Sequence, residues 1–287
     1  MNIKEFKDYA REHLAPSLEK PELRFLVSAL LAHFAGIPNY WYHTHEDHLL
    51  SPAVAGELLQ AVDQAVQGRP LQYILGFVHF GNCRIAVDER VLIPRPETEE
   101  MWDRARHIHG VVLDACTGSG CLAIALKKDR PGTSVHAFDL SPAALEVATG
   151  NALLNQTEVH FFQADLSCID GVEKAAAEAG LEKHTVGLLI SNPPYVTESQ
   201  KKGMSRRVLS YEPHSALFVP DSDPLCHYRQ LALLGNRFLC HGGTLMAEIN
   251  EDFGREVCLL MEQAGYAAVE LHRDLHEKNR IISARGV

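Results

Sequence analysis

The segment Asn192-Pro193-Pro194-Tyr195 combines residue types that could bind a planar amino group. It follows the apolar run VGLLIS at 186–191, which is typical of a buried strand. Proline fixes its own φ and disfavours helical geometry in the residue before it, so the two prolines hold Asn192 and Pro193 extended. The Asn192 side-chain oxygen and the Pro193 carbonyl would then offer two acceptors to one NH2 group, with the Tyr195 ring packed beside it. The pattern predicts a substrate nitrogen whose lone pair is delocalised and must be oriented toward an electrophile. A rigid strand-to-loop turn with a core tyrosine is the alternative interpretation.

A second candidate site involves acidic residues at the ends of three predicted strands. The run VVLDA at 111–115 contains Asp114 and leads into the glycine-containing turn at 116–120, Asp139 ends the next strand, and Asp165 follows the third. The carboxyl ends of parallel strands meet at one edge of a sheet, so these residues predict a cofactor site. In it, Asp139 would accept hydrogen bonds from ribose hydroxyls and Asp165 would reach a base amine. The turn matches neither G-x-G-x-x-G nor the P-loop, and its glycines could serve packing alone.

Positioning these side chains requires an α/β sheet. From residue 110 onward, short apolar strands alternate with helical segments, which predicts βαβ units and a mostly parallel, Rossmann-like sheet of seven strands in a domain spanning 94–287. Residues 1–75 carry helical periodicity in three segments and predict a small helical domain, which we expect to recognise the substrate. Residues 76–93 contain β-branched and aromatic runs around Gly81-Asn82, which predicts a β-hairpin linker.

Composition narrows the classes of function. A net charge of −10 argues against a broad nucleic-acid footprint. The seven cysteines form no C-x-x-C pair, which indicates free thiols in a reducing compartment. The N-terminus has no signal-peptide pattern and no stretch reaches eighteen apolar residues, so we expect a cytoplasmic protein that does not bind membranes. His43, His45 and His48 lie together without completing a ligand set, and we expect no metal.

The two sites together resemble the class I S-adenosyl-L-methionine-dependent methyltransferases that methylate nitrogen. The acidic residue and alternating glycines of that cofactor motif stand here as Asp114-Ala-Cys116-Thr-Gly118-Ser-Gly120, with Cys116 at the first glycine position. The chain further resembles the peptide chain release factor glutamine methyltransferases in RPLQYILGFVHFGNCRIAVDERVLIPRPETEE and ISNPPYV. The segment LIPRPETE at 92–99 is highly specific to that group, and the resemblance covers nearly the whole chain.

The resemblance implies methyl transfer from S-adenosylmethionine to the side-chain amide nitrogen (N5) of the glutamine in the Gly-Gly-Gln motif of class 1 release factors. It implies that the catalytic residues are Asn192, Pro193 and Tyr195, and that the substrate-binding residues are these three with Pro194. It also implies a set of cofactor-binding residues, namely Asp114, Cys116, Thr117, Gly118, Ser119, Gly120, Asp139, Asp165, Leu166 and Asn192. A bulkier aromatic residue often stands at the position of Leu166. The segment SYEPHSALF at 210–218 resembles a family stretch in which Glu212 would order the loop after Tyr195, with a surface turn as the alternative.

Three other functions stay open at this point. The same motif suits an amino group of a nucleic-acid base, against which the acidic charge counts. A ribosomal-protein glutamine is another possible acceptor, because related enzymes share the NPPY motif but usually diverge around LIPRPETE. A noncatalytic S-adenosylmethionine-binding scaffold is the third, and the intact Asn192-Pro193-Pro194-Tyr195 motif weighs against it.

Overall fold

The chain forms two compact units in a computed structural model that describes residues 1–287 except 16–17 and 39. The first unit contains Met1–Gly76 and Ser205–Tyr211, and the second contains Phe77–Met204 and Glu212–Val287. Residues 205–211 therefore group with the helical unit although they lie within the sequence range expected for the catalytic domain.

The first unit is helical, as the periodicity predicts. Its helices are α1 (Ile3–Leu14), α2 (Lys20–Ala35), α3 (Pro52–Val66), α4 (Leu71–Leu75) and α9 (Arg206–Tyr211). Asn2 caps α1 in a capping box with Glu5, and Ser51 caps α3 by accepting from the backbone N–H of Val54 at 3.3 Å. The apolar faces of α1, α2 and α3 form one core that includes Phe6, Leu30 and Leu58.

The predicted hairpin is present but shorter than 76–93. It pairs β1 (Phe77–Phe80) with β2 (Cys83–Ala86) around the two-residue turn at Gly81-Asn82. Residues 87–93, which the prediction includes in the hairpin, form turns and irregular chain instead of strand.

Two asparagines of α7 (Pro142–Leu154) and its C-cap bind the outer edge of β2. Asn151 accepts from the N–H of Ala86 at 2.7 Å and donates to its carbonyl at 3.0 Å. Asn155 does the same for Arg84, at 3.1 and 2.8 Å. Asn151 also donates to the carbonyl of Ser119 at 2.9 Å, so one side chain joins the hairpin to the turn after β3 (Val111–Ala115).

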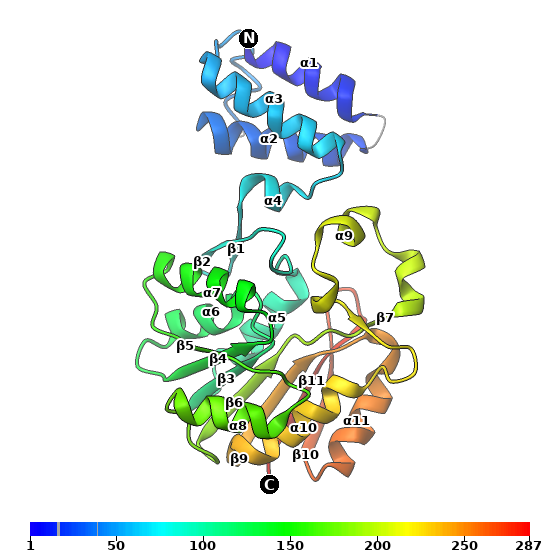
Figure 1. The fold of residues 1–287 in the computed structure, drawn as a ribbon. Helices are drawn as coiled ribbons and strands as arrows, with labels where there is room; N and C mark the ends of the chain where they lie inside the picture. The colour runs from blue at the N-terminus through cyan, green and yellow to red at the C-terminus, as the bar shows by residue number, and fades with distance from the viewer. Residues whose placement is uncertain (16–17, 39) are drawn as a thin grey trace. The chain divides into compact units, whose positions relative to one another are not determined.

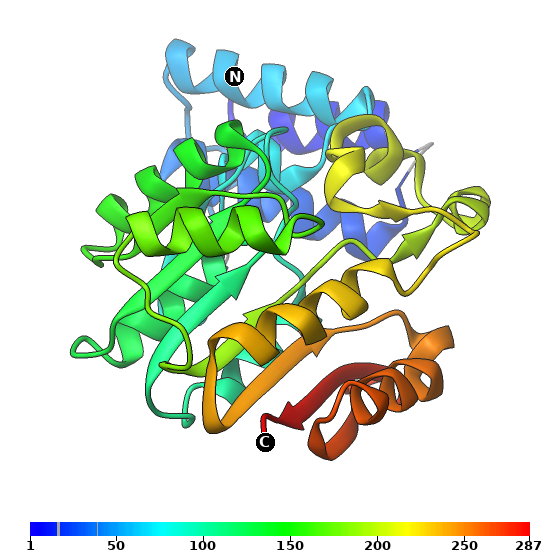
Figure 2. The same cartoon turned by 60° about the horizontal axis from the view of Figure 1, so that its bottom comes forward.

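The second unit is built on a seven-stranded sheet with the order β10-β11-β9-β6-β3-β4-β5 (Figures 1 and 2). Neighbours from β9 to β5 are parallel, and β11 is antiparallel to both β9 and β10. The mostly parallel α/β prediction is confirmed. The strands not yet given bounds are β4 (Val135–Asp139), β5 (His160–Gln163), β6 (Val186–Ser191), β9 (Leu239–Glu248), β10 (Ala267–Arg273) and β11 (Asn279–Arg285).

Helices flank both faces of this sheet, which is the usual arrangement where parallel strands are joined by helical crossovers (Figure 1). One contiguous group is α5 (Pro96–Ala105), α6 (Cys121–Asp129) and α7, and the other is α8 (Ile169–Glu178), α10 (Cys226–Phe238) and α11 (Gly254–Gln263). Every residue of β6 is buried, which explains why its sequence is continuously apolar rather than alternating. Two short strands, β7 (Val196–Thr197) and β8 (Phe218–Val219), pair after the NPPY segment. Within the described residues, no helix combines the length and apolar character that a membrane crossing requires.

Candidate active site

The turn from β3 to α6 adopts backbone conformations that favour glycine. Cys116, Gly118 and Gly120 all have positive φ, at 59°, 53° and 80°. A Cβ on Gly120 would lie 3.0 Å from the Ile124 side chain and 3.1 Å from that of Ala148, so side chains of α6 and α7 would have to shift to admit one. Cys116 carries a side chain in a conformation that L-residues adopt at a cost. The alternating glycines are therefore explained by the positive φ of the backbone at these positions. Cys116 has the same backbone conformation but is not a glycine.

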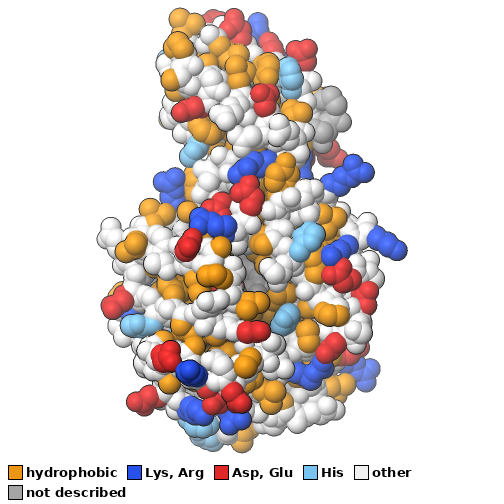
Figure 3. Space-filling model, viewed as in Figure 1, with side chains coloured by type: hydrophobic (Ala, Val, Ile, Leu, Met, Phe, Trp, Pro, Cys, Tyr) orange, Lys and Arg blue, Asp and Glu red, His pale blue; other side chains and the backbone are white. Residues whose placement is uncertain are grey.

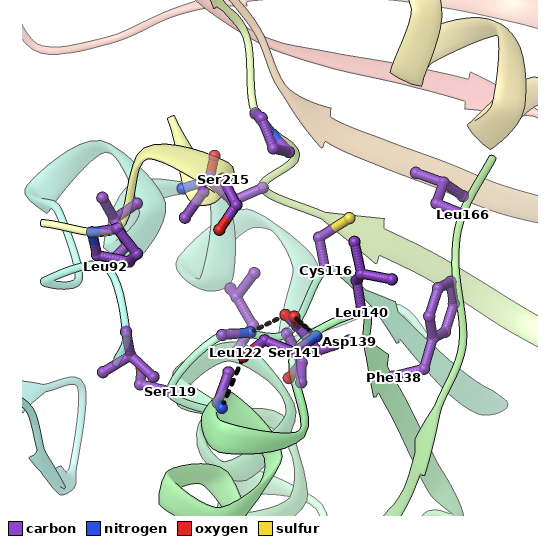
Figure 4. A pocket seen from close by; sticks show the side chains of 18 of the residues that line it. Leu92, Cys116, Ser119, Leu122, Phe138, Asp139, Leu140, Ser141, Leu166 and Ser215 are labelled. Carbon is purple, nitrogen blue, oxygen red and sulfur yellow. Dashed lines mark hydrogen bonds between the residues drawn. The ribbon is translucent and has the colours of Figure 1, made fainter. Parts of the chain in front are cut away.

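A pocket opens above this turn, at the carboxyl edge of the parallel strands. Figure 4 shows Leu92 and Ser215 on one side of it, Phe138 and Leu166 on the other, and Cys116 between them. The predicted residues that line it are Cys116, Thr117, Gly118, Ser119, Asp139, Asp165, Leu166, Asn192 and Pro194. The predicted residues that do not line it are Asp114, Gly120, Pro193 and Tyr195.

Asp139 is held at the pocket by backbone groups. One carboxylate oxygen accepts from the N–H of Gly118 at 2.8 Å and the other from the N–H of Ser141 at 2.9 Å (Figure 4). Burial raises the pKa of this carboxyl, and these backbone hydrogen bonds oppose the rise. A carboxylate offers about four lone-pair positions, so Asp139 keeps acceptors for a ligand.

Asp114 lies beneath the turn, fully buried, rather than in the pocket. It accepts from the Thr117 hydroxyl at 2.6 Å, and its other oxygen has no hydrogen-bond partner among the described residues. Burial raises the pKa of Asp114 to about 7. Asp114 lies one residue before the end of β3, whereas Asp139 is the last residue of β4. This difference explains why Asp139 lines the pocket and Asp114 does not.

The wall formed after β4 and β5 is mainly apolar. Leu166 is buried there, and Phe138 stacks on Phe162 with ring centroids 5.4 Å apart. Asp165 is exposed at the edge of this wall, and one of its carboxylate oxygens accepts from the N–H of Ser167 at 2.8 Å. A flat, weakly polar ligand group suits such a surface.

The Asn192 side chain is the first member of a chain of hydrogen bonds that runs through Thr98 to Glu248. Its side-chain Nδ2 donates to the Thr98 hydroxyl oxygen at 3.0 Å, and Thr98 donates to Glu248 Oε2 at 2.6 Å. The Tyr195 hydroxyl donates to Glu248 Oε1 at 2.6 Å. Burial and the neighbouring carboxyl raise the pKa of Tyr195, and burial raises that of Glu248. Tyr195 thus makes its polar contact behind the pocket.

Several pocket residues are not among the predicted site residues, although Leu92 and Pro94 lie in the LIPRPETE segment that carries the family resemblance. Leu92 and Pro94 come from the segment before α5, Ser215 from the loop before β8, and His227 from α10. The His227 ring Nδ1 donates to the Pro194 carbonyl at 2.9 Å, which bonds α10 to the NPPY segment. Pocket residues on loops far apart in sequence become recognisable only when the sheet brings them together.

Glu212 organises the segment before α5. Its buried carboxylate accepts from the N–H of Ile93 at 3.2 Å and from the Arg95 guanidinium. Glu212 is buried, which rules out the surface-turn alternative, but its hydrogen bonds go to Ile93 and Arg95 rather than to the loop after Tyr195, so the predicted contact is not the one that it makes. In the described part of the chain, no group of three or more His, Cys, Asp or Glu side chains could hold a metal ion.

Comparison with known proteins gives matches over most of the chain. Residues 98–213 match the family described as Methyltransferase small domain, and residues 7–76 match the PrmC N-terminal domain. A release factor glutamine methyltransferase from Bacteroides thetaiotaomicron is 35% identical over 283 residues, covering 96% of this chain and 97% of the relative. One from Flavobacterium psychrophilum is 33% identical, covering 98% of each. Among solved structures, a methyltransferase from Pyrococcus furiosus is similar with 15% identity and a TM-score of 0.49, covering 71% of this chain and 90% of that one.

Proposed function

The chain belongs to the release factor glutamine methyltransferase family, and we propose from this that it methylates the side-chain amide nitrogen (N5) of the glutamine in the Gly-Gly-Gln motif of class 1 peptide chain release factors. The observation that carries the proposal is the position of Asn192. Its side chain lines the same pocket as Asp139 and the 116–119 turn, so an amide held there lies beside the cofactor residues.

The pocket residues fit S-adenosylmethionine, the methyl donor of this class of enzyme. Asp139 retains free acceptor positions for ribose hydroxyls, and the Phe138 and Leu166 side chains offer an apolar wall for the adenine. Asp165 at the edge of that wall is placed to accept from an amine. Gly118 allows close backbone approach, because a Cβ there would meet open space rather than protein. Asp114 and Gly120 support the turn from below.

When bound, S-adenosylmethionine supplies a methyl group that its sulfonium has already activated for transfer. The protein contributes orientation, because a primary amide nitrogen is a poor nucleophile. Asn192 Oδ1 and the Pro193 carbonyl accept the two amide hydrogens and hold the nitrogen toward the cofactor residues. Pro194 and the phenol ring of Tyr195 keep the turn rigid. The reaction forms the new nitrogen–carbon bond, breaks the carbon–sulfur bond, and releases the amide proton to solvent.

An Asn192→Ala variant tests this function. We expect it to bind S-adenosylmethionine like the unmodified enzyme in calorimetry and to lose most methylation of a full-length release factor. Asn236→Ala is the matched control, because Asn236 is exposed on α10 and caps a carbonyl away from the pocket. Equal methylation rates for Asn192→Ala and the unmodified enzyme would overturn the assignment.

Transfer of a radiolabelled methyl group separates the alternatives. The acceptors are a release factor, ribosomal protein, and tRNA or DNA, and we expect label only in the release factor. The names of the relatives support that outcome. On the face shown in Figure 3, Lys and Arg side chains are interspersed with Asp and Glu, unlike the clustered basic surface typical of nucleic-acid binding. Label in no acceptor would favour a noncatalytic role. We further propose that the enzyme works in the cytoplasm, where release factors act.

A further inference from the structure

Glu248 is a carboxylate buried directly behind the NPPY segment. It ends β9 with 1% of its surface exposed. Its two oxygens each accept one short hydrogen bond, from the Tyr195 hydroxyl and from the Thr98 hydroxyl, both at 2.6 Å. Among the described residues, both hydrogen bonds to these oxygens come from hydroxyl donors, so the two oxygens act as acceptors. Burial raises the pKa of the Glu248 carboxyl, and these two hydrogen bonds and the Arg280 guanidinium oppose the rise.

The direction of these hydrogen bonds determines how Asn192 is oriented. A threonine hydroxyl has one hydrogen, and Thr98 donates it to Glu248. Toward Asn192, Thr98 can therefore only accept, so the group of Asn192 that faces it must be the NH2. The amide oxygen of Asn192 is then directed away from Thr98 and stays available as an acceptor.

We propose that Thr98 and Glu248 are positioning residues that fix the amide of Asn192 with its oxygen available to the substrate. The inference rests on the proposed function, in which Asn192 accepts a hydrogen from the glutamine amide. If the Asn192 amide were reversed, an NH2 group would face the substrate's own NH2 group, and two donors cannot bond. By accepting the Thr98 hydrogen, the Glu248 oxygen thus determines which group Asn192 turns toward Thr98 and which group it turns toward the substrate.

Thr98→Val is the first test, because valine keeps the shape of threonine and cannot accept a hydrogen bond. We expect kcat for release-factor methylation to fall by about tenfold or more, with the affinity for S-adenosylmethionine within about twofold of the unmodified enzyme. Thr98→Ser restores the hydroxyl and should recover most of the rate. Thr244→Val on β9 is the matched control, since Thr244 is also buried but its hydroxyl has no partner among the described residues. We expect it to leave kcat unchanged.

Glu248→Gln tests whether the Glu248 oxygens, by accepting the Thr98 hydrogen, fix the orientation of the Asn192 amide. A glutamine presents one acceptor and one donor to two hydroxyl donors, so either Thr98 or Tyr195 loses its acceptor. We expect kcat to fall in this variant as well, with the affinity for S-adenosylmethionine retained.

A double-mutant cycle gives a readout that a purely structural role would not move. In Asn192→Asp both side-chain oxygens are acceptors, so the orientation no longer depends on Thr98. We expect Thr98→Val to lower kcat by about tenfold in the Asn192 enzyme and by less than about twofold in the Asn192→Asp enzyme. Equal fold-losses in both, or a fully active Thr98→Val, would overturn the inference. If Asn192→Ala itself were fully active, the proposed function would fail instead, which keeps the two failures distinguishable.

Discussion

The Arg95 guanidinium donates a charge-assisted hydrogen bond to the Glu212 carboxylate, which lies 117 positions further along the chain. This pair ties the segment before α5 to the loop before β8, and both segments line the pocket through Leu92, Pro94 and Ser215. Glu212 is almost fully buried, whereas 31% of the Arg95 side chain is exposed.

Glu212→Gln should therefore destabilise the fold. We expect a loss of about 1–3 kcal/mol in the free energy of unfolding, below the cost of breaking a fully buried pair because Arg95 can still reach water. Urea unfolding measures it. Glu146→Gln is the control, since Glu146 is paired with Arg90 at an exposed position and should change stability by less than about 0.5 kcal/mol. Equal effects of the two substitutions would contradict the role given to Glu212.

Asp139→Asn should weaken S-adenosylmethionine binding. Asparagine has one acceptor oxygen, whereas both Asp139 oxygens accept backbone hydrogen bonds and must still serve a ligand. We expect the dissociation constant to rise by about 10- to 100-fold in calorimetry, as for loss of hydrogen bonds to a charged group. Asp170→Asn, at an exposed position in the first turn of α8, should leave it unchanged. An unaltered affinity in Asp139→Asn would remove Asp139 from the ribose role.

Asp114 should make stability depend on pH. Its folded pKa is raised to about 7 from 3.8, so its contribution is fully present below about pH 4, where both states are protonated. As the pH rises toward 7, the unfolded chain loses this proton while the native chain keeps it, and stability falls. Above about pH 7 both states are ionised and the loss is complete.

The Asp114→Asn variant isolates this effect, because asparagine stays neutral and can still accept from Thr117. We expect the variant to gain stability relative to the unmodified protein between pH 4 and 7, on the order of 1 kcal/mol per pH unit. Urea unfolding across this pH range measures the difference in free energy of unfolding between the variant and the unmodified protein. The other acidic residues are the same in both proteins, so their contributions cancel in this difference. A difference that does not vary with pH would show that Asp114 is ionised throughout.

Cys116 should tolerate glycine but not a β-branched residue. Its φ of 59° costs an L-residue about 1–2 kcal/mol, which Cys116→Gly relieves while the more flexible unfolded chain offsets part of the gain. We expect the melting temperature of Cys116→Gly to change by only a few degrees, with S-adenosylmethionine binding retained. Cys116→Val should lower both stability and binding, measured by thermal unfolding and calorimetry. Similar behaviour of the two variants would show that the backbone conformation imposes no restriction at this position.

The fold and the edge that carries the site could be predicted from the sequence because their signals are local. Buried parallel strands are continuously apolar, and residues that end such strands meet at one edge, which places Asp139 and Asn192 in one pocket. Cys116 through Ser119 follow from the same rule, whereas the Gly81-Asn82 hairpin turn follows from turn-forming residues between two runs typical of strands.

Long-range contacts could not be predicted in this way. Thr98 and Glu248 are 150 positions apart, and neither residue type indicates the other. The expectation that Tyr195 faces the substrate rested on the residue type, whereas its hydroxyl position depends on a partner in β9. Asp114 differs from Asp139 only by lying inside its strand, and that one-residue offset places it below the turn instead of in the pocket.

The asparagines that bind β2 also have a consequence for solubility. A strand at the border of a two-stranded sheet normally presents a row of free N–H and C=O groups, onto which a strand from another molecule can add. Asn151 and Asn155 occupy both groups of Ala86 and of Arg84, the outward-facing residues of β2. Side chains at the end of a helix thus complete this border without a further strand, so the folded protein offers no free backbone groups at Ala86 and Arg84 onto which a strand from another molecule could add.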